Sequence, residues 1–195
     1  MTMTCVQSLN YNDAPNSCRR EIAEMLNRIW PDENLKQDET ILLTHDESLN
    51  ARSFLTYVDG RLASYVGVVL KTIKHSGQLF NIAGLSCVAT DPDFQGQGLG
   101  SRTVAAATRW IEEQRDIDLG VFTCEPSLAC FYKRAGAWQV NPNVKLIGSC
   151  DERALSSDLL QVVVLLRLFS AKAQTYETKL RQSPINLELP VGQFL

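Results

Sequence analysis

Three glycines between Val88 and Arg102 have the type and spacing needed to bind a pyrophosphate. Gly96, Gly98 and Gly100 lie between a predicted strand and the start of a predicted helix. Glycine adopts backbone angles that other residues avoid, and it leaves no side chain in the way of a close ligand. N–H groups at a helix start form a nest of donors with partial positive charge, which suits phosphate oxygens. The segment therefore predicts a phosphate-binding loop.

The spacing of the glycines separates this loop from two better-known phosphate motifs. A dinucleotide fingerprint, GxGxxG, counted from Gly96 would need its third glycine where Ser101 stands. A P-loop needs a lysine after its last glycine, and this loop has none. Ser101 and Arg102 offer a hydroxyl and a guanidinium to the same phosphates. On this motif alone, a glycine-rich turn that only starts a helix remains an alternative.

The elements around the loop read as a helix, an antiparallel meander, and then alternating strands and helices. An apolar stripe predicts a helix from Ser17 to Trp30, and Asp59-Gly60 and Ser76-Gly77 are hairpin turn signals. Residues 31–40 are expected to be a surface loop or a short helix. Further helices are predicted over residues 98–115, 127–134 and 171–181, and strands over residues 53–58, 62–74, 78–90, 119–124, 144–148, 159–169 and 185–189. This order predicts a mixed α/β layer around one central sheet.

Length and composition favour one domain and exclude several partners. The 195 residues fit a single domain, with residues 169–195 as an extension of uncertain role. The net charge of −3 does not indicate the basic surface that a nucleic-acid-binding protein normally has. The longest apolar run, Val162 to Leu166, is far shorter than the roughly 20 residues of a membrane span, and the first residues do not resemble a signal peptide. The six cysteines and two histidines match no metal-site spacing. A cytoplasmic protein without a metal, a nucleic-acid partner or a membrane partner is expected.

Two motifs together resemble the GNAT superfamily of acyl-CoA-dependent N-acyltransferases. The family signature is Gln or Arg, two residues, Gly, one residue, then Gly or Ala, and Gln95, Gly98 and Gly100 match it after the lead-in DPDF. The second motif, LGVFTCEPSLACFYKRAGAW, looks like the next strand and helix of the family. The resemblance covers roughly residues 16 to 170. The layout is also similar to aminoglycoside 2′-N-acetyltransferases and, more loosely, to nodulation acyltransferases, although Ser86 stands where the former carry an acidic residue.

The resemblance implies a fold and a cofactor site. The expected fold is α/β, with a central mixed, largely antiparallel sheet, a splayed parallel pair of strands and helices on both faces. The expected co-substrate is acetyl-CoA, and no metal is needed. The residues expected to bind it are Val88, Ala89, Thr90, Gln95, Gly96, Gln97, Gly98, Leu99, Gly100, Ser101 and Arg102.

The same resemblance suggests how the reaction would proceed. A small-molecule or peptide amine would attack the thioester directly. Tyr132 is the candidate general acid, because a phenol with a pKa near 10 is protonated at neutral pH and can donate to a leaving thiolate. Glu125 is the candidate base, directly or through water, with Asp91 or a chain of waters as alternatives. Thr123 is a candidate contact to the acceptor.

Two other functions remain open at this point. The first is transfer of a longer acyl chain, which residues 169–195 could cover. The second is a non-catalytic module that only binds acyl-CoA. Residues 169–195 could equally form a dimer contact, so a homodimer is a further alternative.

Overall fold

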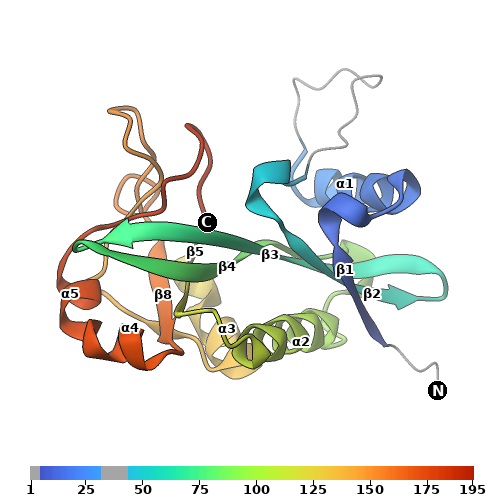
Figure 1. The fold of residues 1–195 in the computed structure, drawn as a ribbon. Coiled ribbons are helices and arrows are strands. Elements are labelled where there is room, and N and C mark those ends of the chain that lie inside the picture. The colour runs from blue at the N-terminus through green and yellow to red at the C-terminus, as the bar shows by residue number, and fades with distance from the viewer. Residues whose placement is uncertain (1–4, 32–43) are drawn as a thin grey trace. The chain divides into compact units, whose positions relative to one another are not determined.

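The computed structural model describes residues 5–31 and 44–195 of the chain. The loop or short helix expected at residues 31–40 therefore lies, apart from Pro31, outside the described residues. The chain divides into two compact units, residues 1–69 with 85–107 and residues 70–84 with 108–195. Strands β3 (Arg61–His75) and β4 (Gln78–Thr90) contribute residues to both units (Figure 1). That the whole chain forms one acyltransferase domain stays a prediction.

The first unit contains an antiparallel sheet in the order β1-β2-β3-β4. Strand β1 (Val6–Asn10) pairs with β2 (Arg52–Val58) over its whole length, and β2 pairs in turn with β3. The expected helix is present as α1 (Asn16–Ile29), and the predicted meander is present within one residue at each end. Strand β1 is absent from the sequence prediction. Its five residues are mostly exposed or half-exposed, so they carry little of the apolar alternation that indicates a strand.

Helices α1 and α2 (Leu99–Glu113) cover opposite faces of this sheet (Figure 1). Two adjacent residues of β2 each form a hydrogen bond to one of the two helices. Successive strand residues point to opposite faces. Thr56 shares a buried hydrogen bond of 2.8 Å with Thr103 of α2. The hydroxyl of Tyr57 donates to Glu21 of α1 at 3.0 Å. The prediction of helices on both faces is confirmed for this unit.

The second unit continues the sheet in the order β3-β4-β5-β8-β6. Strand β5 (Leu119–Cys124) runs parallel to β4, with Ile82 opposite Leu119 and Ala83 opposite Gly120, and antiparallel to β8 (Val163–Leu168) over its whole length. Strand β6 (Gln139–Val140) pairs with β8. The expected α/β class, with a largely antiparallel sheet and one parallel pair, is confirmed.

Four predictions in the C-terminal third are wrong in extent. Of residues 144–148 only β7 (Leu146–Ile147) is a strand, and of residues 185–189 only β9 (Ile185–Asn186) is one. These two strands pair in a separate two-stranded sheet. Residues 159–162 form a turn before β8, because Gln161 has a positive φ of 56° and the N–H of Val162 bonds back to Ser157. The helix predicted over residues 171–181 is two helices, α4 (Ala171–Thr175) and α5 (Glu177–Gln182). No helix in the described ranges is long and apolar enough to cross a membrane.

Trp138 fills the centre of the second unit and fixes helix α3 (Ala129–Gly136) against it. Its indole N–H donates to the hydroxyl of Thr108 at 2.9 Å, and its ring packs edge-on against Phe122 at 4.8 Å. A Cβ at Gly120 or Gly136 would lie within 2.7 Å of the indole, so both positions need glycine to leave room for the ring. The helix that carries Tyr132 is therefore held by close packing.

The first unit contains a buried histidine that is kept neutral by its surroundings. His45 is 3% exposed, and its Nε2 lies 2.9 Å from the hydroxyl of Tyr65, which in turn lies 3.0 Å from Ser53 Oγ. Its ring also meets Tyr11 edge-on at 5.1 Å. Burial lowers the pKa of His45 to about 4, because the charged form loses its hydration without gaining a counter-charge.

This lowered pKa predicts an acid-sensitive fold. An unfolded His45 titrates near its ordinary pKa of 6.5 and the folded one near 4, so the unfolded chain binds more protons between these values. The stabilisation by neutral His45 is complete above pH 6.5 and is lost as the pH falls toward 4. The free energy of unfolding, measured with urea, should fall by about 3 kcal/mol across this window because of this group.

His45→Gln should remove most of that acid dependence, because the amide cannot take up the proton. Ser53→Ala serves as the matched control. It should lower stability at every pH while leaving the acid dependence in place. An acid dependence of His45→Gln equal to that of the unchanged chain would contradict the assignment.

Candidate functional site

The glycine loop has the backbone shape that a phosphate nest requires. Gly96 and Gly98 both have a φ of +76°, in the left-handed region that side chains disfavour. A Cβ at either position would meet no protein atom within 4 Å, so the space above these two residues is open. Residues 95–98 are exposed. The loop thus presents main chain to solvent without a covering side chain.

Helix α2 begins directly at this loop and directs its first N–H groups toward it. The first helical hydrogen bond runs from the N–H of Arg102 to the carbonyl of Gly98 at 3.1 Å. The N–H groups of the preceding turn have no partner within the helix, as at every helix start. Leu99 is 4% exposed and fixes the first turn in the core. The predicted loop residues from Gln95 to Arg102 are therefore brought together as a donor-rich helix start.

The end of strand β4 leads into this loop and contains an unusual backbone angle. Cys87 has a φ of 51°, which is uncommon for a residue with a side chain. Directly after it come Val88, Ala89 and Thr90, the residues expected to pair with the pantetheine arm. The carbonyl of Ala89 accepts from Ser64 Oγ at 3.0 Å. Nothing in the sequence pattern indicated the backbone kink at Cys87.

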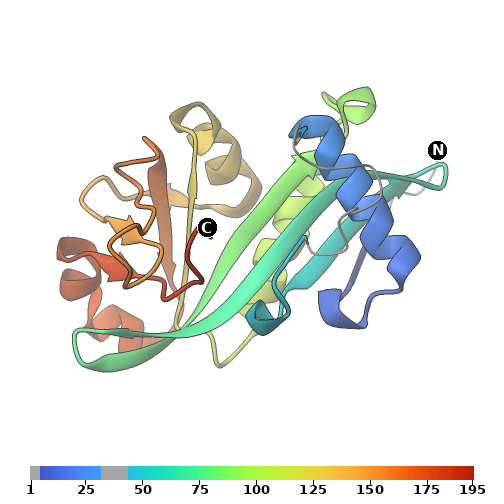
Figure 2. The same ribbon diagram turned by 90° about the horizontal axis from the view of Figure 1, so that it is seen from above.

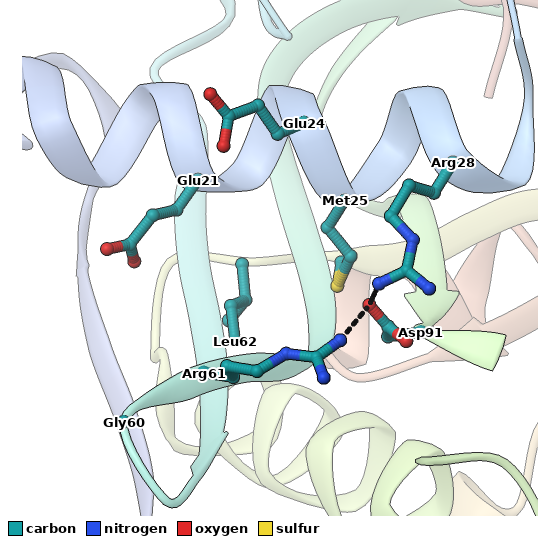
Figure 3. Close-up of a pocket in the computed structure, with 8 residues that line it drawn as sticks. All are labelled: Glu21, Glu24, Met25, Arg28, Gly60, Arg61, Leu62 and Asp91. Carbon is teal, nitrogen blue, oxygen red and sulfur yellow. Dashed lines mark hydrogen bonds and ion pairs between the residues drawn. The ribbon is translucent and has the colours of Figure 1, made fainter. Parts of the chain in front are cut away.

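A cavity of about 210 Å³ lies beside the start of the loop, between α1 and the β2–β3 hairpin (Figure 3). Its walls combine apolar, acidic and basic side chains. The side chains of Met25 and Leu62 lie between two acidic residues, Glu21 and Glu24, and two basic ones, Arg28 and Arg61. The eight residues that line it are Glu21, Glu24, Met25, Arg28, Gly60, Arg61, Leu62 and Asp91. Of the predicted loop lead-in, only Asp91 reaches this cavity.

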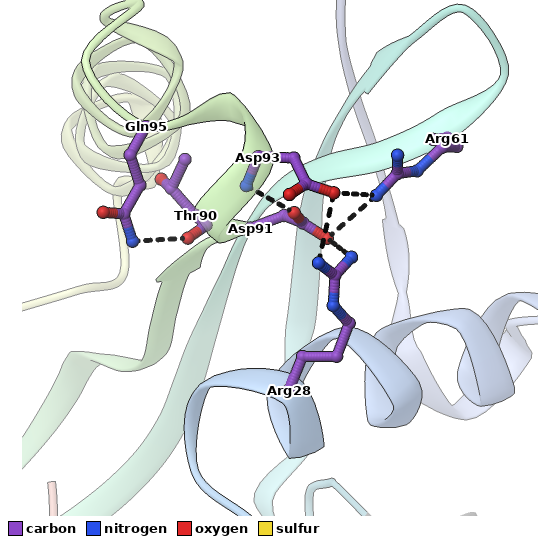
Figure 4. A network of polar contacts seen from close by, with 6 residues as sticks. All are labelled: Arg28, Arg61, Thr90, Asp91, Asp93 and Gln95. Atoms are coloured by element: carbon purple, nitrogen blue, oxygen red, sulfur yellow. Dashed lines mark hydrogen bonds and ion pairs between the residues drawn. The ribbon is translucent and has the colours of Figure 1, made fainter.

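Asp91 and Asp93 form a four-membered ion-pair network with two arginines from distant parts of the unit (Figure 4). Arg28 of α1 donates to Asp91 at 2.6 Å and to Asp93 at 3.1 Å. Arg61 of β3 donates to Asp93 at 2.9 Å and lies 3.5 Å from Asp91. Hydrogen bonds from Arg61, and then from Arg28, lower the pKa of the Asp93 carboxyl below its ordinary value.

Asp91 also shapes the loop itself. Its carboxylate accepts from the N–H of Asp93 at 3.0 Å, which caps the short helical turn Pro92–Phe94, and its own N–H donates to the carbonyl of Ala63. The side chain of Gln95 then reaches back to the carbonyl of Thr90 at 3.2 Å. Sequence reasoning recognised Asp91 as part of a motif but missed both arginine partners, because they are 63 and 30 residues away in the sequence.

Tyr132 lies in the second unit, on helix α3, next to the end of strand β5. It is 5% exposed and packs edge-on against Phe122, with ring centroids 5.0 Å apart. Burial, and then the neighbouring Cys124 thiol, raise the pKa of Tyr132 above its ordinary value. Burial, and then the charge of Glu125, raise the pKa of Cys124 to about 11. Both groups are therefore protonated at neutral pH, and Cys124 is not an activated nucleophile.

Thr123 and Glu125 lie on either side of Cys124 in the same unit. Glu125 is exposed and accepts a long hydrogen bond of 3.4 Å from Ser127. The N–H of Thr123 donates to the main-chain oxygen of Leu195 at 3.0 Å, and its hydroxyl donates to the same oxygen. The structure thus places Thr123 and Glu125 on either side of Cys124 at the end of β5, while Tyr132 lies beside Phe122 and Cys124. The contact with Leu195 was not predicted, because 72 residues separate the partners.

Comparison with known proteins assigns the family. The family model described as the acetyltransferase (GNAT) family matches residues 18–137. The chain therefore belongs to the GNAT acetyltransferase family, whose members transfer acyl groups from acyl-CoA. No curated protein sequence matches the chain. The finer resemblance to aminoglycoside 2′-N-acetyltransferases stays a prediction.

Solved structures show the same fold at low sequence identity. The GNAT family N-acetyltransferase YhbS from Escherichia coli, solved in complex with CoA, has a TM-score of 0.60 and 14% identity over 94% of this chain and 88% of that one. A GNAT acetyltransferase from Streptococcus pneumoniae has a TM-score of 0.57 and 16% identity over 85% and 100%. A probable N-acyltransferase from Enterococcus faecalis has a TM-score of 0.56 and 18% identity over 72% of this chain but only 33% of that longer one.

The network predicts unequal roles for the two aspartates. Asp91→Asn should destabilise the fold by about 2 kcal/mol, because a carboxylate that is 4% exposed loses its charge opposite Arg28. It should also weaken CoA binding, because the loop start loses its anchor. Urea unfolding and calorimetric titration with CoA measure the two effects.

Asp93→Asn is the matched control, since its side chain is 54% exposed and it contacts the same two arginines. Exposed ion pairs contribute little to stability. Its stability and its CoA affinity should stay close to those of the unchanged chain. Equal effects of the two substitutions would contradict the role given to Asp91.

Proposed function

We propose that this chain is an N-acetyltransferase that transfers the acetyl group of acetyl-CoA to an amine of a small molecule or a peptide. The observation that carries the proposal is the glycine loop at the start of α2. Two left-handed glycines with open space above them, followed by the free N–H groups of a helix start, fit a pyrophosphate. Family membership supports CoA as the carrier of that pyrophosphate.

The cofactor end of the proposed site relies on main-chain groups. Gln95 to Arg102 hold the pyrophosphate, and Val88, Ala89 and Thr90 pair with the pantetheine arm as an added strand. The N–H near Thr90 polarises the thioester carbonyl and stabilises the oxyanion that forms on attack. Acetyl-CoA supplies an activated acyl group, so the protein needs neither a metal nor a covalent intermediate.

The acceptor end relies on side chains near the end of β5. The amine attacks the thioester carbon, the carbon–sulfur bond breaks, and Tyr132 donates its proton to the departing thiolate. Its raised pKa keeps it protonated through the neutral range, as this role requires. Glu125, exposed at the end of β5, takes the proton that the amine loses, directly or through water. We place the reaction in the cytoplasm, with the chain acting as a monomer or a homodimer.

Release of CoA thiol from acetyl-CoA in the presence of a panel of amines tests this function, with Gly98→Ala as the informative variant. The new Cβ would project into the open space above the loop and would strain a residue with positive φ. The KM for acetyl-CoA should rise about tenfold, which corresponds to roughly 1.4 kcal/mol of lost binding.

Gly77→Ala is the control for this variant. Gly77 lies in the β3–β4 turn with a φ of +78° and open space around it, so the alanine adds a similar strain of about 1–2 kcal/mol away from the loop. Its KM should not change. Tight CoA binding without thiol release on any amine would instead indicate a non-catalytic binding module.

Tyr132→Phe tests the general acid. The ring and its packing against Phe122 are kept while the hydroxyl is lost, so stability should change little. The value of kcat should fall about 100-fold, a typical loss for a proton donor, with little change in either KM. Tyr176→Phe, whose ring packs against Phe80 elsewhere in the same unit, is the control and should keep full activity. Unchanged turnover of Tyr132→Phe would exclude the acid role.

A further inference from the structure

Strand β5 has one edge that its strand neighbours cover only in part. Its other edge is paired with β8 at all six residues, from Leu119 to Cys124. On the β4 side, pairing is confined to Leu119 and Gly120. The remaining main-chain groups on that side need other partners, because unpaired N–H and C=O groups in a protein interior are costly.

Leu195 supplies that partner at Thr123. The main-chain oxygen of Leu195 accepts from the N–H of Thr123 at 3.0 Å and also from its hydroxyl. The last described residues therefore lie along β5, beside the strand and within the same unit (Figure 2). At Thr123, Leu195 thus provides the main-chain hydrogen-bond acceptor that a neighbouring strand would provide elsewhere in the sheet.

The side chain of Leu195 occupies the space directly beyond the parallel pair. It is 8% exposed and lies against Gly84, where a Cβ would come within 2.7 Å of Leu195 Cδ1 and within 2.7 Å of the carbonyl of Val121. Only glycine at this position leaves room for both the leucine and the strand. The absence of a side chain at residue 84 thus fits the presence of Leu195.

Residues 185–189, which precede the last six residues, are fixed at many points, whereas residues 190–194 are exposed or half-exposed. The N–H groups of Ile185, Leu187 and Leu189 donate to carbonyls of residues 145–148 at 2.7–2.9 Å, and all three side chains are buried. Glu188 accepts from the N–H of Lys74 at 3.0 Å, and its carbonyl accepts from the Lys71 ammonium. Dense hydrogen bonding and burial oppose local opening.

From this arrangement we infer that Leu195 is a specificity-determining residue, whose side chain limits the size of the acceptor amine, and that Thr123 is the positioning residue that holds it. The inference rests on the proposed function, which places the acceptor near the end of β5. It changes the expected role of Thr123. Both donors of Thr123 are used by Leu195, so Thr123 acts on the acceptor through Leu195.

Leu195→Ala tests the inference with a series of primary alkyl amines from methylamine to hexylamine. Removing the leucine side chain opens space for the acceptor, so the ratio of kcat/KM for the longest to the shortest accepted amine should rise at least about tenfold. The KM for acetyl-CoA should stay within about twofold. A general loss of stability would lower all rates together and leave this ratio unchanged.

Three further variants test whether the position of Leu195 on Thr123 sets the size limit. Thr123→Val keeps the N–H but loses the hydroxyl and should shift the ratio in the same direction, while Thr123→Ser should leave it as in the unchanged chain. Val191→Ala, at a residue of the same segment that is 51% exposed, should have no effect. An unchanged ratio in Leu195→Ala would overturn the inference. Higher turnover for all amines alike would also overturn it, because it would show that Leu195 only blocks access to the site and does not select by size.

Hydrogen exchange at the Thr123 amide tests the docked segment without relying on activity. The amide should exchange slowly in the unchanged chain and at least about tenfold faster in Leu195→Gly, because the added freedom of glycine loosens its acceptor. Fast exchange in the unchanged chain would overturn the inference. Slow exchange in a chain that acetylates none of the amines would overturn the proposed function and show the docked segment to be structural only.

Discussion

The carboxylate of Asp91 is the interaction on which the proposed cofactor end of this protein depends. It lies at the point where strand β4 ends and the glycine loop begins, and it is buried against Arg28 from α1 with Arg61 from β3 close by. The same carboxylate caps the short turn that follows. One group thus ties a helix, a strand and the loop lead-in together. A loop whose own residues are mostly glycine and exposed polar groups needs such an anchor, because glycine gives the chain freedom and no packing.

The charges of this anchor cancel, and this has a consequence for phosphate recognition. Arg28 and Arg61 face Asp91 and Asp93, two positive groups against two negative ones. The network therefore adds little net potential to the loop beside it. The attraction for a pyrophosphate must come mainly from the N–H groups of the α2 start and from the helix dipole. Recognition by main chain also fits the three glycines among residues 95–102.

The parts of the structure that local pattern controls were predictable from the sequence. The GxGxG loop, the hairpin turns at Gly60 and Gly77, and the apolar stripe of α1 all act over a few residues, and each is present where it was expected. The elements that were missed or given wrong bounds have weak local signals. Strand β1 exposes most of its side chains, and β9 is a strand over only the first two of its five predicted residues. Arg28 and Leu195 carry no signal at all, since their roles exist only through partners far away in the sequence.

The acceptor end follows a different physical rule from the cofactor end. Coenzyme A is the same molecule for every member of such a family, so main-chain donors in a fixed loop are sufficient to bind it. An acceptor amine must be distinguished by its shape, which requires side chains with defined positions. In the second unit those positions are set by close packing around Trp138 and by the docking of Leu195 on Thr123. The packing around Trp138 depends on Gly120 and Gly136, where a side chain would collide with the indole. The docking of Leu195 depends on Gly84, where a side chain would collide with the leucine. Under the proposed function, selectivity therefore depends as much on the side chains that are absent from β4, β5 and α3 as on those that are present.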